Sequence, residues 1–371
     1  MSAVLAYGNV VAMLTGRQGY QVSVLDAATG KPLQRHQLTV AGNSTALGSE
    51  PVRLLRDTFQ GRPVAVVRFK EQVPASGTQG EHDQLTDLVL DSEGKQVWRT
   101  PTTGGRSTDT RRKEGGSFNS GYAISHATTQ GTLDKSPEGI TSFQSITGGG
   151  PVRVNSSYGN DDVHDVVTDK AVMTDDKGLL DEGLRGVDLS QGGKTIWRKP
   201  KAEYVGAFGP NLMIENGDRI QQIDPATGQR RSDVAASEIS GGSSGLSLDQ
   251  VESWTYDPDT HAISAGGQRT LIIDGDTGKL RSRQDGPNPR ELTATAAGGG
   301  VTFMAIEPKP AMPTIDGPAE KRPTSFLALD NRTGKILADN LPLTAISITD
   351  NKYALVENDG NFYSFHLKTE E

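Results

Sequence analysis

Apolar residues recur along the chain in short runs that are typical of β-strands. Some runs alternate apolar and polar residues, as around Val22 and Val24, and others are continuous, as in Leu271-Ile272-Ile273. Alternation predicts a half-buried strand, and a short continuous run predicts a strand buried on both faces. Apolar residues nowhere repeat at helical spacing over three turns, so we predict many short strands and no long helix.

A polar motif follows most of these runs. In its full form it reads Asp-x-x-Thr-Gly, where the aspartate can accept backbone N–H groups of the turn and the threonine hydroxyl can assist. The glycine then adopts a left-handed conformation, and the next strand begins. Each copy therefore predicts a hairpin connection. Six copies begin at Asp26, Asp91, Asp188, Asp224, Asp274 and Asp330, and a degenerate seventh occupies residues 364–369.

Repetition of one hairpin motif indicates a repeat architecture. The motif resembles the quinoprotein-like (PQQ-like) β-propeller repeat, in which a tryptophan follows the Gly-Lys pair; Trp98 and Trp197 take that place here. The resemblance, to the BamB-like scaffold type, implies an all-β chain folded as a single β-propeller over residues 1–371. It implies four-stranded antiparallel blades, with Trp98 and Trp197 packed between adjacent blades.

The spacing of the copies predicts seven blades. The 97-residue interval between Asp91 and Asp188 leaves room for a further blade near residues 121–146, so eight blades are the alternative. A ring closes best when the first and last strands share a blade, and we expect this of the segment from Val10 to Leu14 and that from Phe362 to Leu367.

Long insertions are expected at residues 71–83, 101–150 and 308–323, with others at 36–50, 175–182 and 231–250. If the repeat turns join the third and fourth strands of each blade, all of these segments lie at the opposite face. Extra length on one face of a repeat array is the usual place for binding. Loops also tolerate insertions at little cost, which is the alternative explanation.

The composition of the chain argues against several kinds of site and partner. The chain has 371 residues, a net charge of −8 and no cysteine. The absence of cysteine excludes disulfides, thiolate metal sites and a cysteine nucleophile, and an acidic chain is not expected to bind nucleic acid. The longest apolar run, from Val10 to Leu14, is too short to span a membrane. We expect a monomer in an extracytoplasmic location, periplasmic or at the cell surface, with a leader or membrane anchor missing ahead of Met1.

The sequence predicts no catalytic, cofactor-binding or metal-binding residues. Residues 161–165 (Asp-Asp-Val-His-Asp) are dense in oxygen ligands but lack the alternate spacing of a calcium loop, so an acidic surface loop is expected. Residues 241–245 match the Gly-x-Ser-x-Gly elbow only formally, because no strand and helix flank them. The basic residues Arg106, Arg111, Arg112 and Lys113 form a solvated loop or a contact for an anionic partner.

The sequence therefore predicts a non-enzymatic protein-interaction or ligand-binding scaffold, part of an exported bacterial envelope protein. Its partner would be another envelope protein or an anionic envelope component, bound at the face that carries the insertions. One alternative is a ligand-sensing ectodomain of a membrane receptor or kinase. A further alternative is a quinone-dependent dehydrogenase, although relatives of that kind commonly carry adjacent cysteines near the cofactor.

Overall fold

The structure is a computed structural model, and almost all of what it describes is β-strand. Among these residues there is no α-helix, and a single 3-10 turn occupies Leu189–Gln191. The described part of the chain contains no helix that is long and apolar enough to cross a membrane. The described residues are 3–16, 19–40, 52–59, 62–77, 80–101, 123–127, 131–135, 141–145, 152–154, 163–167, 169–175, 183–235, 251–267, 270–284, 290–306, 325–358 and 361–368.

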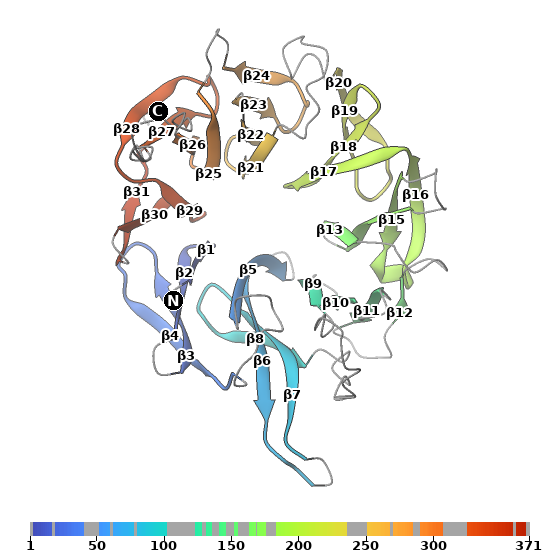
Figure 1. The fold of residues 1–371 in the computed structure, drawn as a ribbon, viewed down its shortest axis with the longest axis vertical. Helices are drawn as coiled ribbons and strands as arrows, with labels where there is room; N and C mark the ends of the chain where they lie inside the picture. Colours follow the sequence, from blue (N-terminus) through green and yellow to red (C-terminus); the bar gives the residue numbers. More distant parts are fainter. Residues whose placement is uncertain are drawn as a thin grey trace, which may run out of the picture. The chain divides into compact units, whose positions relative to one another are not determined.

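The chain divides into two compact units, and the first comprises Met1–Lys201 with Ala226–Gly228. It contains four antiparallel sheets, each made of four strands that follow one another in the sequence (Figure 1). The strands are β1 (Ala3–Tyr7), β2 (Val10–Thr15), β3 (Tyr20–Asp26), β4 (Pro32–Leu38), β5 (Val52–Phe59), β6 (Arg62–Val73), β7 (His82–Leu90), β8 (Gln96–Pro101), β9 (Ala123–Ala127), β10 (Gly131–Lys135), β11 (Thr141–Ser145), β12 (Val152–Arg153), β13 (Val163–Val167), β14 (Lys170–Thr174), β15 (Gly183–Asp188) and β16 (Lys194–Pro200).

The second unit comprises Ala202–Pro225 and Gln229–Glu371. Strands β17–β20 form one sheet, and β21–β24 and β25–β28 form two groups of four that a single residue pair, Gly267 with Leu292, joins into one sheet. Strands β29–β31 form a three-stranded sheet. The strands are β17 (Ala202–Phe208), β18 (Asn211–Asn216), β19 (Arg219–Ile223), β20 (Arg230–Ala235), β21 (Val251–Asp257), β22 (Ala262–Gly267), β23 (Leu271–Asp274), β24 (Leu280–Arg283), β25 (Leu292–Gly298), β26 (Val301–Ile306), β27 (Ser325–Asp330), β28 (Ile336–Leu341), β29 (Ala345–Ile348), β30 (Tyr353–Asn358) and β31 (Asn361–His366).

The six clear copies of the sequence motif are the turns between the third and fourth strands of their groups, as predicted. They join β3 to β4, β7 to β8, β15 to β16, β19 to β20, β23 to β24 and β27 to β28. The glycine of each full copy is left-handed, with φ of 68° at Gly30 and 71° at Gly334. This conformation is strained for residues with a Cβ, which explains the glycine.

A backbone hydrogen bond repeats with the turns. The residue after the motif aspartate donates its N–H to the carbonyl that precedes the second strand of the same group. The degenerate seventh copy makes this bond too, through Leu367, although His366 stands in the aspartate position. The bonds are Ala27 to Asn9 (3.2 Å), Leu189 to Asp169 (3.0 Å), Gly275 to His261 (2.6 Å), Asn331 to Gly300 (2.9 Å) and Leu367 to Lys352 (2.8 Å).

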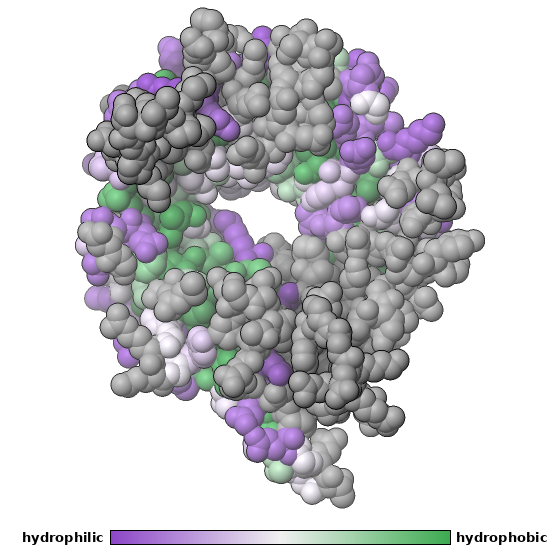
Figure 2. Space-filling model, viewed as in Figure 1, coloured by the Kyte–Doolittle hydropathy of each residue, from purple (hydrophilic) through white to green (hydrophobic). Residues whose placement is uncertain are grey.

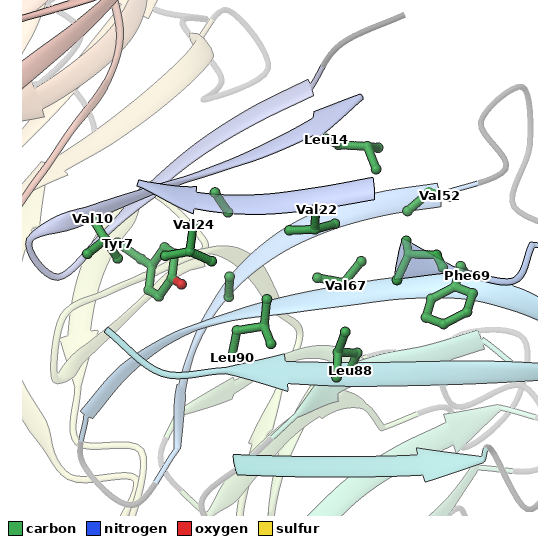
Figure 3. Packing of buried hydrophobic residues seen from close by; sticks show 13 residues of the cluster. Tyr7, Val10, Leu14, Val22, Val24, Val52, Val67, Phe69, Leu88 and Leu90 are labelled. Carbon is green, nitrogen blue, oxygen red and sulfur yellow. The ribbon is translucent and has the colours of Figure 1, made fainter. Parts of the chain in front are cut away.

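Apolar side chains fill the space between consecutive sheets. Figure 3 shows one such cluster, in which alternate residues of β2 and β3 meet alternate residues of β6 and β7. Val22, Val67 and Phe69 are fully buried there. Strands buried on both faces, such as β15, arise because sheets pack against each side of them. The cluster contains Tyr7, Val10, Ala12, Leu14, Val22, Val24, Leu38, Val52, Ala65, Val67, Phe69, Leu88 and Leu90.

The tryptophan position of the repeat lies against the turn glycine of the next group, whichever residue occupies it. The indole of Trp197 covers Gly186 in the neighbouring strand, and a Cβ placed on Gly228 would lie 2.6 Å from its Cγ. The predicted packing of Trp197 between blades is therefore confirmed. Trp98 packs on Val64, Val66 and Val89, and its predicted role between blades stays a prediction, because residues 146–151 lie outside the described part. The other pairs of this kind are Gln34 with Gly94, Val154 with Gly193, Ser232 with Gly278 and Ser282 with Gly334.

The structure contradicts two predictions, one about the insertion at residues 101–150 and one about the terminal strands. Residues 101–150 are not one connecting insertion, because β9, β10 and β11 lie within them and pair with β12. This sheet lies where the eight-blade alternative placed an additional blade, and the number of blades stays a prediction. The terminal strands do not share a blade: β1 pairs with β2 in the β1–β4 sheet, and β31 belongs to the β29–β31 sheet.

Candidate interaction surface

Two kinds of connection leave opposite ends of each sheet. In an antiparallel group of four, the turn between the third and fourth strands lies at one end and the connection between the second and third strands at the other. The segments 71–83, 175–182 and 308–323 contain connections of the second kind, which join β6 to β7, β14 to β15 and β26 to β27. That these segments are long insertions at one face stays a prediction. Residues 176–182 and 308–323 lie outside the described part.

The side chains of the repeat turns are committed to their own backbone. Asp26 accepts hydrogen bonds from the N–H and the hydroxyl of Thr29, both at 2.7 Å, and these bonds lower the pKa of the Asp26 carboxyl. Asp274 is held by Thr277 and by Arg281. Burial raises the pKa of Asp274, but these hydrogen bonds outweigh it and lower the pKa to about 2. Such aspartates are ionised at neutral pH and have little capacity left for a ligand.

The turns also hold the neighbouring group of strands. The hydroxyl of Tyr7 donates to the carbonyl of Asp91 (3.0 Å), and burial raises the pKa of that hydroxyl. In the second unit, the amide of Asn211 donates to the carbonyl of Gly275 at 2.6 Å. Each bond runs from the connection between the first two strands of one group to the repeat turn of the next. This end of the sheets therefore has a structural role.

A buried polar network strengthens this end in the second unit. Asp257 is fully buried, and its Oδ2 accepts from the side chain of Asn331 (2.8 Å), the N–H of Gly300 (3.0 Å) and the hydroxyl of Thr260 (2.6 Å). Thr302 donates to Asn331 Oδ1 at 2.6 Å. The network supplies several donors to this carboxyl, as a buried polar group requires. We had not predicted it, although residues 257–260 (Asp-Pro-Asp-Thr) repeat the Asp-x-x-Thr signal in a different connection.

The β6–β7 hairpin is a described part of the predicted binding face. Strand β5 pairs with β6 only through Phe69, and β8 pairs with β7 only from Thr86. The two long strands continue past β5 and β8 to the pair Val73 with His82, so the hairpin extends beyond its own sheet (Figure 1). Figure 2 shows hydrophilic residues over part of this hairpin. Residues 71–83 thus form the end of a regular hairpin.

Charged contacts hold the base of this hairpin. Arg68 and Asp87 form a buried bidentate pair, with both N–O distances 3.0 Å, and burial raises the pKa of Asp87 against the opposing effect of Arg68. Glu71 accepts from the hydroxyl of Thr86 (2.8 Å) and from Arg99, whose guanidinium lies 5.9 Å from the Phe69 ring centre. Bidentate arginine–carboxylate pairs fix geometry.

A second segment braces the same base. The N–H of Gln72 donates to the carbonyl of Thr39 (3.1 Å), and Val40 forms an isolated bridge with Glu71. The projecting hairpin is therefore attached at its base to a second segment of the chain. Its exposed residues, from Pro74 to Gly77 and at Gly80 and Glu81, are presented on a fixed support.

The other motifs of the sequence are only partly described, and their described residues do not form a site. His164 Nε2 lies 2.9 Å from the Thr174 hydroxyl, and Asp165 accepts from the N–H of Val166, while Asp161 and Asp162 lie outside the described part. Residues 241–245, Arg106 and residues 111–113 also lie outside it. Among the described residues, no three acidic or histidine side chains are grouped so as to hold a metal ion.

Comparison with known proteins adds information on the fold. No family model and no curated protein matches the chain, so the quinoprotein-like family stays a prediction. The computationally designed Ika8 protein matches 99% of this chain and 96% of its own at 14% identity, with a TM-score of 0.50. A eukaryotic initiation factor matches 99% and 88% at 12% identity, also with a TM-score of 0.50. BamB from Moraxella catarrhalis matches 100% and 95% at 14% identity, with a TM-score of 0.46.

At these identities the likeness concerns architecture alone. It agrees with the consecutive four-stranded antiparallel sheets, the turns between their third and fourth strands and the apolar packing from sheet to sheet. The chain is an all-β protein with the β-propeller fold.

Proposed function

We propose that this protein is a non-enzymatic scaffold that binds another protein through the face on which the β6–β7 hairpin projects. One observation carries the proposal: the hairpin continues past both neighbouring strands to Val73 and His82 and is braced at its base. A rigid projection presents side chains without the entropy cost of ordering a loop on binding. The opposite end of the sheets is occupied by turns that hold their own backbone and their neighbours.

The proposal extends to segments that, within their own unit, leave the sheets at the end away from the repeat turns. Residues 308–323 are rich in proline, and Arg106, Arg111, Arg112 and Lys113 would favour an anionic region of the partner in an otherwise acidic chain. We further propose an extracytoplasmic location, in line with the resemblance to envelope scaffolds. A fusion to a reporter enzyme that is active only outside the cytoplasm tests the location, and activity confined to the cytoplasm would contradict it.

Shortening the hairpin tests the proposed function. Residues 74–81 are replaced by Asn-Gly, which closes a two-residue hairpin directly on the Val73–His82 pair and keeps the register. The bracing contacts at Glu71 and Gln72 remain, so the melting temperature should stay within about 2 °C of the parent. Capture of partner proteins from an envelope extract should fall at least about tenfold.

The matched control changes the opposite end. Lys279→Glu with Lys335→Glu alters the charge of two exposed repeat-turn residues without touching a motif aspartate. This variant should capture the same proteins as the parent. If the variant with the shortened hairpin captured partners as the parent does and the lysine variant did not, the binding surface would lie at the repeat-turn end. That result would contradict the proposal.

A further inference from the structure

Strands β21–β24 and β25–β28 are the two groups that share one sheet in the described part of the chain, because Gly267 of β22 pairs with Leu292 of β25. Two further contacts hold the same end of these groups together. The N–H of Ala294 in β25 donates to the hydroxyl of Ser253 in β21 at 2.7 Å. A Cβ placed on Gly266 would lie 2.7 Å from the nitrogen of Ala294 and would overlap the carbonyl of Leu292. The two backbones therefore meet at the end away from the repeat turns.

The repeat-turn end of the same two groups is joined by carboxyl groups. The connection between β21 and β22 carries Asp257 and Asp259. They accept from the backbone N–H groups of Gly300 (3.0 Å) and Gly299 (2.9 Å), which lie in the connection between β25 and β26. Asp257 also accepts from the side chain of Asn331 in the repeat turn after β27, at 2.8 Å. Opening this end would leave buried polar groups without partners, which is costly.

Further contacts lie between the two ends. The hydroxyl of Ser264 in β22 lies 2.8 Å from that of Thr302 in β26, and both residues are fully buried. The guanidinium of Arg281, in the fourth strand β24, donates to the carbonyl of Asn331 at 3.3 Å. Polar contacts thus extend from the first strand of the group, β21, to its fourth. The apolar residues packed in this interface are Ala262, Ile272, Leu292, Ala294, Met304, Leu327 and Leu329.

An interface that is held at one end alone can open about that end, as a hinge does. An interface that is held at both ends and across its width opens only when all of its contacts break together. We infer that β21–β28 form one conformational unit of eight strands, which opens and moves as a whole. The neighbouring β17–β20 and β29–β31 lie in separate sheets in the described part of the chain, so we expect the unit to end at them. The inference does not depend on the function proposed for the β6–β7 hairpin.

Hydrogen exchange of the whole protein at low urea concentrations tests the inference. The backbone amides of β22 and β23 report on one group, and those of β26 and β27 report on the other. All four strands should exchange with the same free energy of opening and the same dependence on urea, because one opening exposes them all. The amides of β18 and β19, in a separate sheet, should show a different dependence on urea.

Variants perturb each group in turn. Gly266→Ala places a methyl group of β22 against the backbone of β25, and Met304→Ala removes a fully buried side chain from β26. Each should speed exchange about tenfold or more, by the same factor in β22, β23, β26 and β27. Met304→Ala carries the test if Gly266→Ala does not fold. Gly80→Ala is the matched control, because a Cβ there meets nothing within 4 Å, and exchange in both groups should equal that of the parent.

Two kinds of result would overturn the inference. The first is a different urea dependence in the two groups of the parent, or faster exchange only in the group that carries the substitution, since the groups would then open separately. The second is an equal increase of exchange in β18 and β19, since the cooperative unit would then be larger than β21–β28.

Discussion

At the scale of single residues, buried hydroxyl groups differ in whether they have a hydrogen-bond partner. The hydroxyl of Ser264 is buried and lies 2.8 Å from the hydroxyl of Thr302, within the network of Asp257. The hydroxyl of Ser232 is buried without a hydrogen-bond partner. A buried hydroxyl contributes to stability only when it is paired, so these two serines should respond to the same substitution in opposite directions.

Ser232→Ala should raise the free energy of unfolding by about 1 kcal/mol, because it removes an unsatisfied polar group. Ser264→Ala should lower it by about 1–3 kcal/mol, because Thr302 loses a partner in a buried site. Urea unfolding at neutral pH measures both. Equal destabilisation by the two substitutions would show that the environment of Ser232 is as polar as that of Ser264.

Because of the turn aspartates, the stability of the fold should depend on pH in the acidic range. Asp274 has a folded-state pKa of about 2, below the value of about 3.9 expected for an unfolded chain. A carboxyl whose folded pKa is lower stabilises the fold fully above its unfolded pKa, and this contribution is lost as the pH falls through the folded pKa. Melting temperature should therefore fall between about pH 4 and about pH 2.

Asp274→Asn should lower the melting temperature at neutral pH and reduce its further fall in acid. The comparison is Asp218→Asn, which neutralises an exposed residue in the β18–β19 turn and controls for the loss of one negative charge. Thermal unfolding at a series of pH values gives the result. An acid dependence of Asp274→Asn as steep as that of the parent would contradict the assigned role of this carboxyl.

At the scale of elements, the repeat turns position one group of strands against the next. Gly30 and Gly334 have nearly the same φ, but their surroundings differ. A Cβ on Gly30 would meet nothing within 4 Å, whereas a Cβ on Gly334 would overlap the side chain of Ser282. The two glycines therefore separate backbone strain from packing between groups.

Gly30→Ala should cost about 1 kcal/mol from the left-handed backbone alone. Gly334→Ala should cost about 1–3 kcal/mol more, because the added methyl group displaces Ser282. Adding Ser282→Gly to Gly334→Ala should cost less than the sum of the two single changes, since the overlap is then removed. Urea unfolding measures all four proteins, and additive costs would contradict contact between these positions.

The elements also show how far sequence patterns reach. The Asp-x-x-Thr-Gly copies correctly placed six connections between third and fourth strands, because an aspartate, a threonine and a glycine each have a defined task in the turn. The sheet β9–β12 was predicted only in the eight-blade alternative, because the sequence before β12 contains Gly148, Gly149 and Gly150 and no motif aspartate.

Contacts between elements were harder to predict than the elements themselves. Trp197 was correctly placed against the next group because a large residue at a fixed repeat position carries a strong signal. Ser232 and Ser282 occupy the same position but give no such signal. The buried pair of Arg68 and Asp87 was missed, since each is an ordinary charged residue in sequence and only the register of β6 on β7 brings them together.

At the scale of the whole molecule, each sheet has one end with a structural role, and we propose that the other end of the β5–β8 sheet binds a partner. One end consists of short turns linked to neighbouring groups by Tyr7, Asn211 and the network of Asp257. The other end carries the braced β6–β7 hairpin and the longer connections. A partner that binds the protein should therefore contact the second end and leave the first unchanged.

Hydrogen exchange of the protein in complex with a captured partner tests this division most directly. The account predicts slower exchange on binding in residues 70–85, which include the projecting part of the hairpin, and no change in the repeat turns at residues 26–31, 224–229 and 330–335. Slower exchange in those turns, with residues 70–85 unaffected by the partner, would contradict it.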